Sequence, residues 1–233
     1  VCGGGGIADG ECDCDGNIDL DCGCGAAGPS GCDNQCGSNL ENDECGECGG
    51  DGSSCGTSTF DYCLALTSGA NLKSFYGLPE DMSIANVMSS LGASVTGVIT
   101  AGGSASQTET GSWQGSIANI SPLKGYWIIV SNAIDLCLED VTSTDPTIEY
   151  SLNSGANLIS FPADGSVGIS DALPDDIISS VSGIITAGGS TSQNDDGSWV
   201  GNLTEFTGGK GYWVITTEGI SLSYDLSTLA RRH

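Results

Sequence analysis

The sequence has little positive charge and almost no histidine. Its 233 residues include 30 Asp and Glu but only five Lys and Arg, which gives a formal net charge of −25. Such a chain repels phosphate backbones and anionic lipid, so nucleic-acid and membrane-surface binding are not expected. The single histidine, His233, is the last residue. The chain itself therefore cannot supply a Ser-His-Asp triad, a His-ligated zinc ion or a CxxCH haem site, and we expect that it is not an enzyme.

Long apolar runs are also missing. None approaches the roughly 18 residues of a membrane span, and no signal peptide is visible. Large aliphatic side chains are scarce before Thr59, where the only ones are Val1, Ile7, Ile18, Leu20 and Leu40. A hydrophobic core cannot form from so few, so cross-links or bound ions must replace it. We expect an exported, acidic protein without membrane insertion, either mature or a fragment.

Residues 1–60 are instead rich in cysteine and acid. They hold ten of the 12 cysteines and 12 acidic residues, with no Lys or Arg. An even number of cysteines can pair internally as disulfides, although the spacing does not fix the partners. The alternative is zinc or iron–sulfur ligation by three close pairs: Cys12 with Cys14, Cys22 with Cys24, and Cys45 with Cys48. Disulfides are favoured because nearby carboxylates raise the pKa of a thiol and oppose thiolate formation.

The rest of the chain contains one module twice. The stretch GVITAGGSASQTETGSWQG at 97–115 matches GIITAGGSTSQNDDGSWVG at 183–201, and KGYWIIV at 124–130 matches KGYWVIT at 210–216. The order and spacing of the matches are nearly constant, which rules out chance similarity. The predicted organisation is a Cys/Asp/Gly-rich segment at 1–60, module copies at 61–141 and 149–225, a linker at 141–147 and a tail at 226–233.

Each module is predicted to be mainly β with one short helix. Apolar runs indicate strands at 157–161, 211–215 and 220–224. The sequences TETGSW and NDDGSW indicate hairpin turns in which Gly111 and Gly197 supply the positive φ. In the first copy, Ile84, Val87 and Leu91 define a helix face, with Ser83 or Asp81 as the cap and Gly92 as the stop. In the second copy, Pro174 shortens the helix.

Two cysteines lie in the first module. Cys63 is on its predicted first strand and Cys137 on its predicted last strand, and we equate them with Ser151 and Ser223 of the second copy. Since both would be lost together, the economical interpretation is a Cys63–Cys137 disulfide between neighbouring strands. The alternative is two unrelated buried thiols. Closing a loop of this length would stabilise the module by about 4 kcal/mol in the chain-entropy model.

An acidic loop near the N-terminus places oxygen ligands at alternate positions. Its candidate ligands are Glu11, Asp13, Asp15, Asn17, Asp19 and Asp21. Gly16 is sixth and Ile18 eighth, as in an EF-hand-type loop, and hard oxygen ligands suit Ca²⁺ better than a transition metal. The departure is Cys22 at the twelfth position, so Asp21 or a distant carboxylate must complete the shell. The alternative is a solvated acidic loop held by disulfides.

Two sequence patterns resemble known secreted proteins. The motifs CDCDGNIDLDCGC at 12–24 and DECGECGGDGSSC at 43–55 resemble Cys/Gly/Asp-rich repeats of bacterial surface proteins, which are distantly similar to thrombospondin type 3 calcium repeats. NLISFP at 157–162 and GYWV at 211–214 resemble small β-rich modules of bacterial surface and secreted proteins, of which NLKSFYGLP at 71–79 is a looser copy. Both resemblances imply a cell-surface or matrix setting, and neither implies catalysis.

These features favour a non-enzymatic structural subunit of an extracellular bacterial fibre or surface layer, stabilised by disulfides and Ca²⁺. Copies are expected to join head to tail, because the first 60 residues are purely acidic whereas the tail ends in Arg231, Arg232 and His233. For the tail, the alternative is a remnant of proteolysis. For the whole chain, the alternative is a carbohydrate- or surface-binding stalk of a larger adhesin or secreted hydrolase, with glycans as partners. The paired tryptophans would then stack on sugars, although core or hairpin roles are favoured for them.

Overall fold

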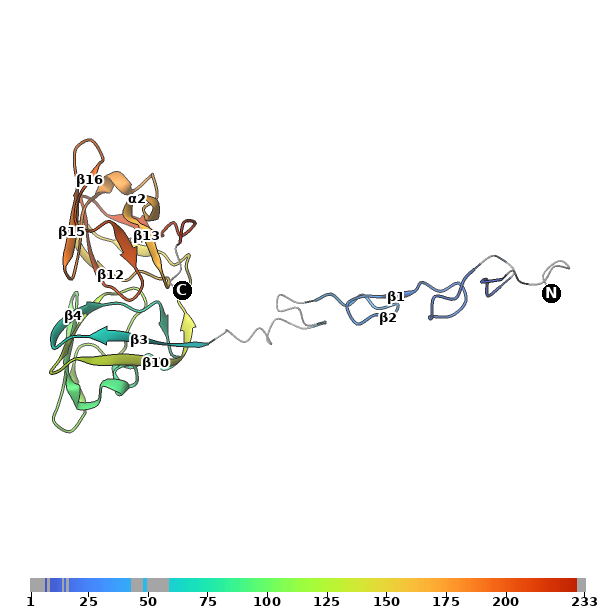
Figure 1. Cartoon of the computed structure of the whole chain (residues 1–233), viewed down its shortest axis with the longest axis horizontal. Helices are drawn as coiled ribbons and strands as arrows, with labels where there is room; N and C mark the ends of the chain where they lie inside the picture. The colour runs from blue at the N-terminus through green and yellow to red at the C-terminus, as the bar shows by residue number, and fades with distance from the viewer. Residues whose placement is uncertain are drawn as a thin grey trace. The chain divides into compact units, whose positions relative to one another are not determined.

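The chain divides into two compact units, Val1–Ser58 and Thr59–His233. The computed structural model describes residues 7, 9–13, 15, 17–42, 48–49 and 59–229. Figure 1 shows the first unit as a narrow succession of loops and the second as a pair of β-modules. The fold is mainly β, as the sequence predicts, with disulfides in the first unit and, among the described residues, short helices in the second.

The described residues of the first unit have minimal secondary structure and form no hydrophobic core. Strands β1 (Pro29–Ser30) and β2 (Gln35–Cys36) form one small ladder, and single bridges join Asp19 to Cys24 and Asn42 to Cys48. None of its described side chains is buried, and the larger aliphatic ones are about half exposed. The scarcity of aliphatic residues therefore has its expected consequence.

The second unit repeats one topology. The first module contains β3 (Phe60–Leu66), β4 (Gly69–Lys73), β5 (Gly77–Leu78), α1 (Ile84–Val87), a 3₁₀ turn (Ser89–Ser94), β6 (Val95–Thr100), β7 (Gly103–Gln107), β8 (Trp113–Gly115), β9 (Tyr126–Val130) and β10 (Ile134–Ser143). The second contains β11 (Tyr150–Leu152), β12 (Gly155–Ile159), β13 (Ser166–Gly168), α2 (Ile169–Ala172), a 3₁₀ turn (Ile178–Ser180), β14 (Val181–Thr186), β15 (Gly189–Gln193), β16 (Trp199–Gly201), β17 (Glu205–Thr207), β18 (Tyr212–Thr216) and β19 (Ile220–Leu222).

Each module is built on a five-stranded antiparallel sheet. The orders are β4-β9-β6-β7-β8 and β12-β18-β14-β15-β16, and the first strand of each module pairs with the last, β3 with β10 and β11 with β19. Each module also has its own hydrophobic core. Strand β9 shows how alternation creates the core, because Tyr126, Ile128 and Val130 are buried while Trp127 and Ile129 between them are half-buried.

Three local signals in the repeat are confirmed, but α1 ends at Val87 and not at the predicted stop, Gly92. Gly111 and Gly197 have φ of 81° and 82° in the β7–β8 and β15–β16 turns. Ser83 caps α1 by accepting a hydrogen bond from Asn86 N. The second helix ends after one turn, just before Pro174, as a proline ring there requires.

Two module boundaries differ from the predicted ones. Strand β10 continues to Ser143, and Val141 is fully buried, so the first three residues of the predicted linker belong to the first module. At the other end, Leu226 and Leu229 pack against the core of the second module. The apolar side chains in both segments are short-range signals that the repeat alignment alone passed over.

Candidate functional site

Three overlapping disulfides hold the first unit together. They join Cys12 to Cys24, Cys22 to Cys36 and Cys32 to Cys48, each with a Cα–Cα distance of 5.4 Å. Each covalent loop begins before the preceding one ends, so consecutive loops are interlocked along the sequence. We call this set the disulfide ladder. Because only a thiolate ligates zinc or iron strongly, these six cysteines are not metal ligands in this state. Cys14 and Cys45, from the same close pairs, lie outside the described residues.

Within the acidic loop, Asp13 organises the backbone. One carboxylate oxygen accepts the backbone N–H of Asp15 at 2.9 Å and that of Asn17 at 3.1 Å, while the other accepts the Asn17 side-chain amide at 2.6 Å. The Asn17 side chain is the main cause, and these hydrogen bonds together hold the pKa of Asp13 below its ordinary value. A carboxylate oxygen of Asp19 likewise accepts a hydrogen bond from the backbone N–H of Gly23 at 2.9 Å.

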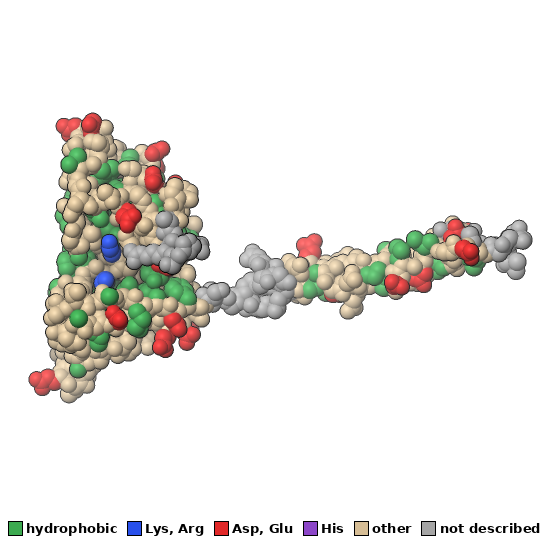
Figure 2. Space-filling view, in the orientation of Figure 1, with side chains coloured by type: hydrophobic (Ala, Val, Ile, Leu, Met, Phe, Trp, Pro, Cys, Tyr) green, Lys and Arg blue, Asp and Glu red, His purple; other side chains and the backbone are tan. Residues whose placement is uncertain are grey.

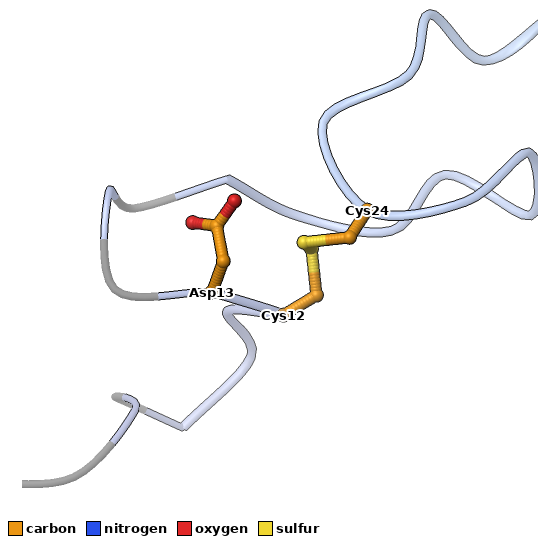
Figure 3. A group of neighbouring side chains, drawn as sticks. All are labelled: Cys12, Asp13 and Cys24. Atoms are coloured by element: carbon orange, nitrogen blue, oxygen red, sulfur yellow. A yellow bond between two sulfur atoms is a disulfide. The ribbon is translucent and has the colours of Figure 1, made fainter. Parts of the chain in front are cut away.

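The predicted calcium ligands do not converge in the described part of the loop. Among described His, Cys, Asp and Glu side chains, one group of three has its ligand atoms within 4.8 Å of one another: Cys12, Asp13 and Cys24. Figure 3 shows that two members of this group are the sulfurs of a disulfide, beside the Asp13 carboxylate. Glu11, Asp15, Asn17, Asp19 and Asp21 are exposed, and Gly16 lies outside the described residues. Calcium binding stays a prediction.

A fourth disulfide joins Cys63 to Cys137 across β3 and β10, the pair that the repeat comparison singled out. Their Cα atoms are directly opposite each other at 4.0 Å. In the second module the strand register confirms Ser223 as the counterpart of Cys137, but Ser151 is not the counterpart of Cys63. Tyr150 faces Leu222 just as Leu64 faces Leu136, and Ser151 faces Ser221.

The counterpart of Cys63 is therefore Glu149 and not Ser151. The first module has two more residues between its first tyrosine and the Ser-Gly turn, YCLALTSG against YSLNSG, so matching the tyrosines shifts the alignment by two positions. Glu149 accepts a hydrogen bond from the Ser221 hydroxyl. A polar side-chain pair thus connects the strands that the disulfide joins in the first module.

The modules contact each other through equivalent surfaces. Ser74 donates its backbone N–H to Gly209 O at 3.2 Å, and Ser160 donates its own to Leu123 O at 3.3 Å. These pairs are equivalent in the repeat, since 160 − 74 and 209 − 123 both give 86. We call this contact the seam. Its symmetry is isologous, because the same surface of each module meets the other.

The KGYW motif explains why the seam is close. A Cβ on Gly211 would lie 2.8 Å from Lys73 O, and one on Gly125 would lie 2.7 Å from the Leu158 side chain. Only glycine permits this approach of the two backbones. The tyrosine of the motif, Tyr126 or Tyr212, accepts a backbone N–H from Ser121 or Thr207.

All three lysines of the chain lie at the seam. Lys73 bridges to Lys210, and Lys124 bridges to Ile159, its equivalent partner across the seam. On the face shown in Figure 2, lysine side chains gather at the junction of the modules. Directly opposite residues of an antiparallel pair place their side chains on the same side, so Lys73 and Lys210 confront each other. Burial, and then the charge of Lys210, lower the pKa of half-buried Lys73.

The lysines have no carboxylate partner within residues 59–229, where no ion pair is recorded for them. None of the three lysines was among the site residues predicted from the sequence. The informative signal was the replacement of Ile159 by Lys73 at the equivalent position of the other copy. A charge where the repeat places a core residue indicates a local function or a local cost.

A groove of about 500 Å³ lies beside the seam. Its walls are Phe60, Tyr76, Ser143, Thr144, Pro146, Pro162, Ala163, Asp164, Leu226 and Leu229. Phe60 and Tyr62 stack on Tyr76 at ring-centroid distances of 6.0 and 4.2 Å. The four tryptophans are half-buried, and Trp113 and Trp199 pack against the two cores. The aromatic groove was not predicted, because Phe60 and Tyr76 approach only after the module folds.

Several other observations bear on function. Arg231 and Arg232, the predicted assembly residues, lie outside the described residues. Within the described chain, no helix is long and apolar enough to cross a membrane. Scans of protein-family models, curated proteins and solved structures found no match to this chain. Four disulfides are typical of proteins from an oxidising compartment.

Proposed function

We propose that the protein is a non-enzymatic structural subunit of an extracellular bacterial fibre or surface layer. The disulfide ladder carries this proposal, because three interlocked covalent loops stiffen a segment that has no hydrophobic core. A segment of this kind suits a spacer better than a site for small-molecule chemistry. The resemblance of residues 12–24 and 43–55 to repeats of bacterial surface proteins supports the same setting.

The β-modules offer surfaces for assembly. Strands β8 and β16 are the outer strands of their sheets, so each presents one unpaired backbone edge. Val200 at the centre of β16 is 59% exposed. Such edges pair readily with a strand of another chain. Repeated pairing of unlike surfaces produces an open, head-to-tail filament, which is the arrangement we propose.

Negative-stain electron microscopy of the oxidised full chain tests this function. We expect ordered filaments whose length increases with protein concentration. A variant with Val200→Lys in the edge strand should form fewer or shorter filaments. Ile99→Lys adds the same charge on β6, an interior strand of the other module, and serves as the control. Monomers at every concentration and salt condition would contradict the proposal.

Calcium is part of the proposal and has its own test. Residues 1–60 carry 12 acids without Lys or Arg, so bound cations would reduce their mutual repulsion. We expect EGTA to increase protease cleavage between Asp13 and Asp21 while leaving the β-modules resistant. Asp15→Asn should weaken calcium binding more than the control Asp33→Asn. Unchanged cleavage after chelation would identify a solvated loop.

The aromatic groove favours a second candidate, a glycan-binding stalk. Sugars stack on exposed aromatic rings and donate hydrogen bonds to nearby carboxylates, and the groove offers Phe60, Tyr76 and Asp164. Under this alternative, soluble oligosaccharides should shift the NMR signals of the groove, and Phe60→Ala should abolish the shifts. The protein would then stay monomeric in the microscope.

A further inference from the structure

The seam concentrates positive charge in a strongly acidic protein. Lys73, Lys124 and Lys210 are three of its five basic residues, against 30 acidic ones. The bridges that place them together involve equivalent segments of both modules, so the cluster exists only when the modules are packed. Lys124 and Lys210 are exposed, and Lys73 is half-buried.

The positive charges of this cluster are not neutralised by the described residues of the modules. Lys73 and Lys210 repel each other, and no carboxylate of residues 59–229 pairs with any of the three lysines. Like charges on directly opposite strand positions destabilise a sheet. The second module avoids the conflict by placing Ile159 where the first has Lys73. An incoming carboxylate would relieve the repulsion between Lys73 and Lys210.

We propose that the lysines of the seam form the docking site for the acidic N-terminal unit of a second copy of this chain. That unit carries 12 acidic residues and no Lys or Arg, so its charge is complementary to that of the lysines. Asp15, Asp19 and Asp21 are exposed on it. The contact joins unlike surfaces and is therefore of the head-to-tail kind.

This inference rests on the proposed function and makes it specific. It moves the basic side of the head-to-tail contact from Arg231 and Arg232 to side chains whose placement depends on the folded modules. Three partly solvated ion pairs are individually weak, so the contact should be sensitive to salt and should act together with strand pairing.

Zero-length carbodiimide cross-linking of the full chain tests the docking site. An equal mixture of ¹⁵N-labelled and unlabelled protein distinguishes links between chains from links within one chain. We expect Lys73, Lys124 or Lys210 joined to acidic residues of the first 58, in peptides of mixed label. Links only within one chain, links only to carboxylates after residue 58, or no links at the lysines would overturn the inference.

Assembly provides the second measurement. The triple variant Lys73→Ile, Lys124→Gln and Lys210→Gln should raise the critical concentration about tenfold at low salt, the sum expected of three partly exposed pairs. The matched variant with arginine at all three positions should stay within about twofold of the parent. Equal critical concentrations for both variants would overturn the inference. Filaments formed without the cross-links would refute this docking site alone, whereas mixed-label cross-links without filaments would refute the fibre and retain the contact.

Discussion

The two units of this protein are stabilised internally by different means. In the first, no described side chain is buried, and three overlapping disulfides connect loops whose described pairing is the small β1–β2 ladder and two isolated bridges. In the second, two hydrophobic cores are covered by antiparallel sheets. The comparison teaches that a chain can combine an entropic means of stabilisation, which restricts the unfolded state, with burial of apolar surface.

The two modules offer a finer comparison inside the second unit. They share strand order, turn glycines and the hydrogen bonds of the seam, yet one has a disulfide where the other has Glu149 beside the first strand. One has Lys73 where the other has the core residue Ile159. Each difference is a substitution that evolution has already tested in the same backbone.

Reduction of the disulfides should produce the largest difference in stability between the two units. Each loop of the disulfide ladder spans 12 to 16 positions, and closing such a loop stabilises by about 3 kcal/mol. We expect dithiothreitol to raise proteolysis within residues 9–42 at least about tenfold, because nothing buried replaces the cross-links. Tryptophan fluorescence should stay native, since all four tryptophans lie in the modules, which we expect to remain folded without the Cys63–Cys137 disulfide. Protease resistance after reduction would show that ions or packing hold the first unit.

Removal of a core ring should affect only the second unit. Phe161 is fully buried, and its ring lies 5.2 Å from that of Tyr224 and 5.8 Å from that of Phe206. We expect Phe161→Ala to lower the free energy of unfolding by about 3–5 kcal/mol in a denaturant titration followed by fluorescence. Leu40→Ala, at a side chain that is 46% exposed, is the control and should cost less than about 0.5 kcal/mol. Similar losses from both variants would contradict the contrast between the units.

The module disulfide should be useful but dispensable. Cys63 and Cys137 close a loop with a sequence separation of 74, so the variant with serine at both positions should lose about 2–4 kcal/mol. The module should still fold, because the second copy does so without a disulfide at the equivalent strands. A denaturant titration measures the loss, and Ser223→Ala in the second module is the control. An unfolded first module would mean that burial there is insufficient.

Local features of the modules could be predicted from the sequence because short-range physics fixes them. Gly111 and Gly197 adopt the positive φ that their hairpin turns require. Ser83 precedes the apolar helix face of the first module and caps α1. Aligning the two tyrosines gave the wrong counterpart, Ser151, because the first module has two more residues between its tyrosine and the Ser-Gly turn. Strand register depends on the whole hairpin, and the repeat supplied no direct view of it.

The lysines of the seam show the limit of this reasoning. Lys73 and Lys210 are 137 positions apart, and only the packing of two folded modules makes them neighbours. The same holds for Phe60, Pro162 and Leu229 in the groove. In the acidic loop the sequence suggested ligands for an ion, but hydrogen bonds from Asn17 and Gly23 already occupy two of the carboxylates. Oxygen spacing along a chain does not determine where those oxygens point.

The smallest expected effect concerns the pKa of Lys73. Burial and the charge of Lys210 lower the pKa of Lys73 in the folded state below its ordinary value of 10.5. At a pH between these two pKa values, the unfolded state binds more protons than the folded state. Stability then rises with pH until 10.5, and the cost of charging Lys73 is fully present at neutral pH. We therefore expect Lys73→Ile to stabilise the chain at pH 7 by less than about 1 kcal/mol, because solvent screens this half-buried group.

The gain from Lys73→Ile should shrink as the pH rises. Measurements should stay below about pH 9.5, because unfolded tyrosines begin to ionise above it and the raised pKa values of Tyr126 and Tyr150 then make stability fall. The parent chain, measured over the same pH range, is the control. The same Lys73→Ile change is expected to weaken assembly. A residue that only packs would move both properties in one direction, so opposite signs for stability and assembly separate a docking lysine from a structural one.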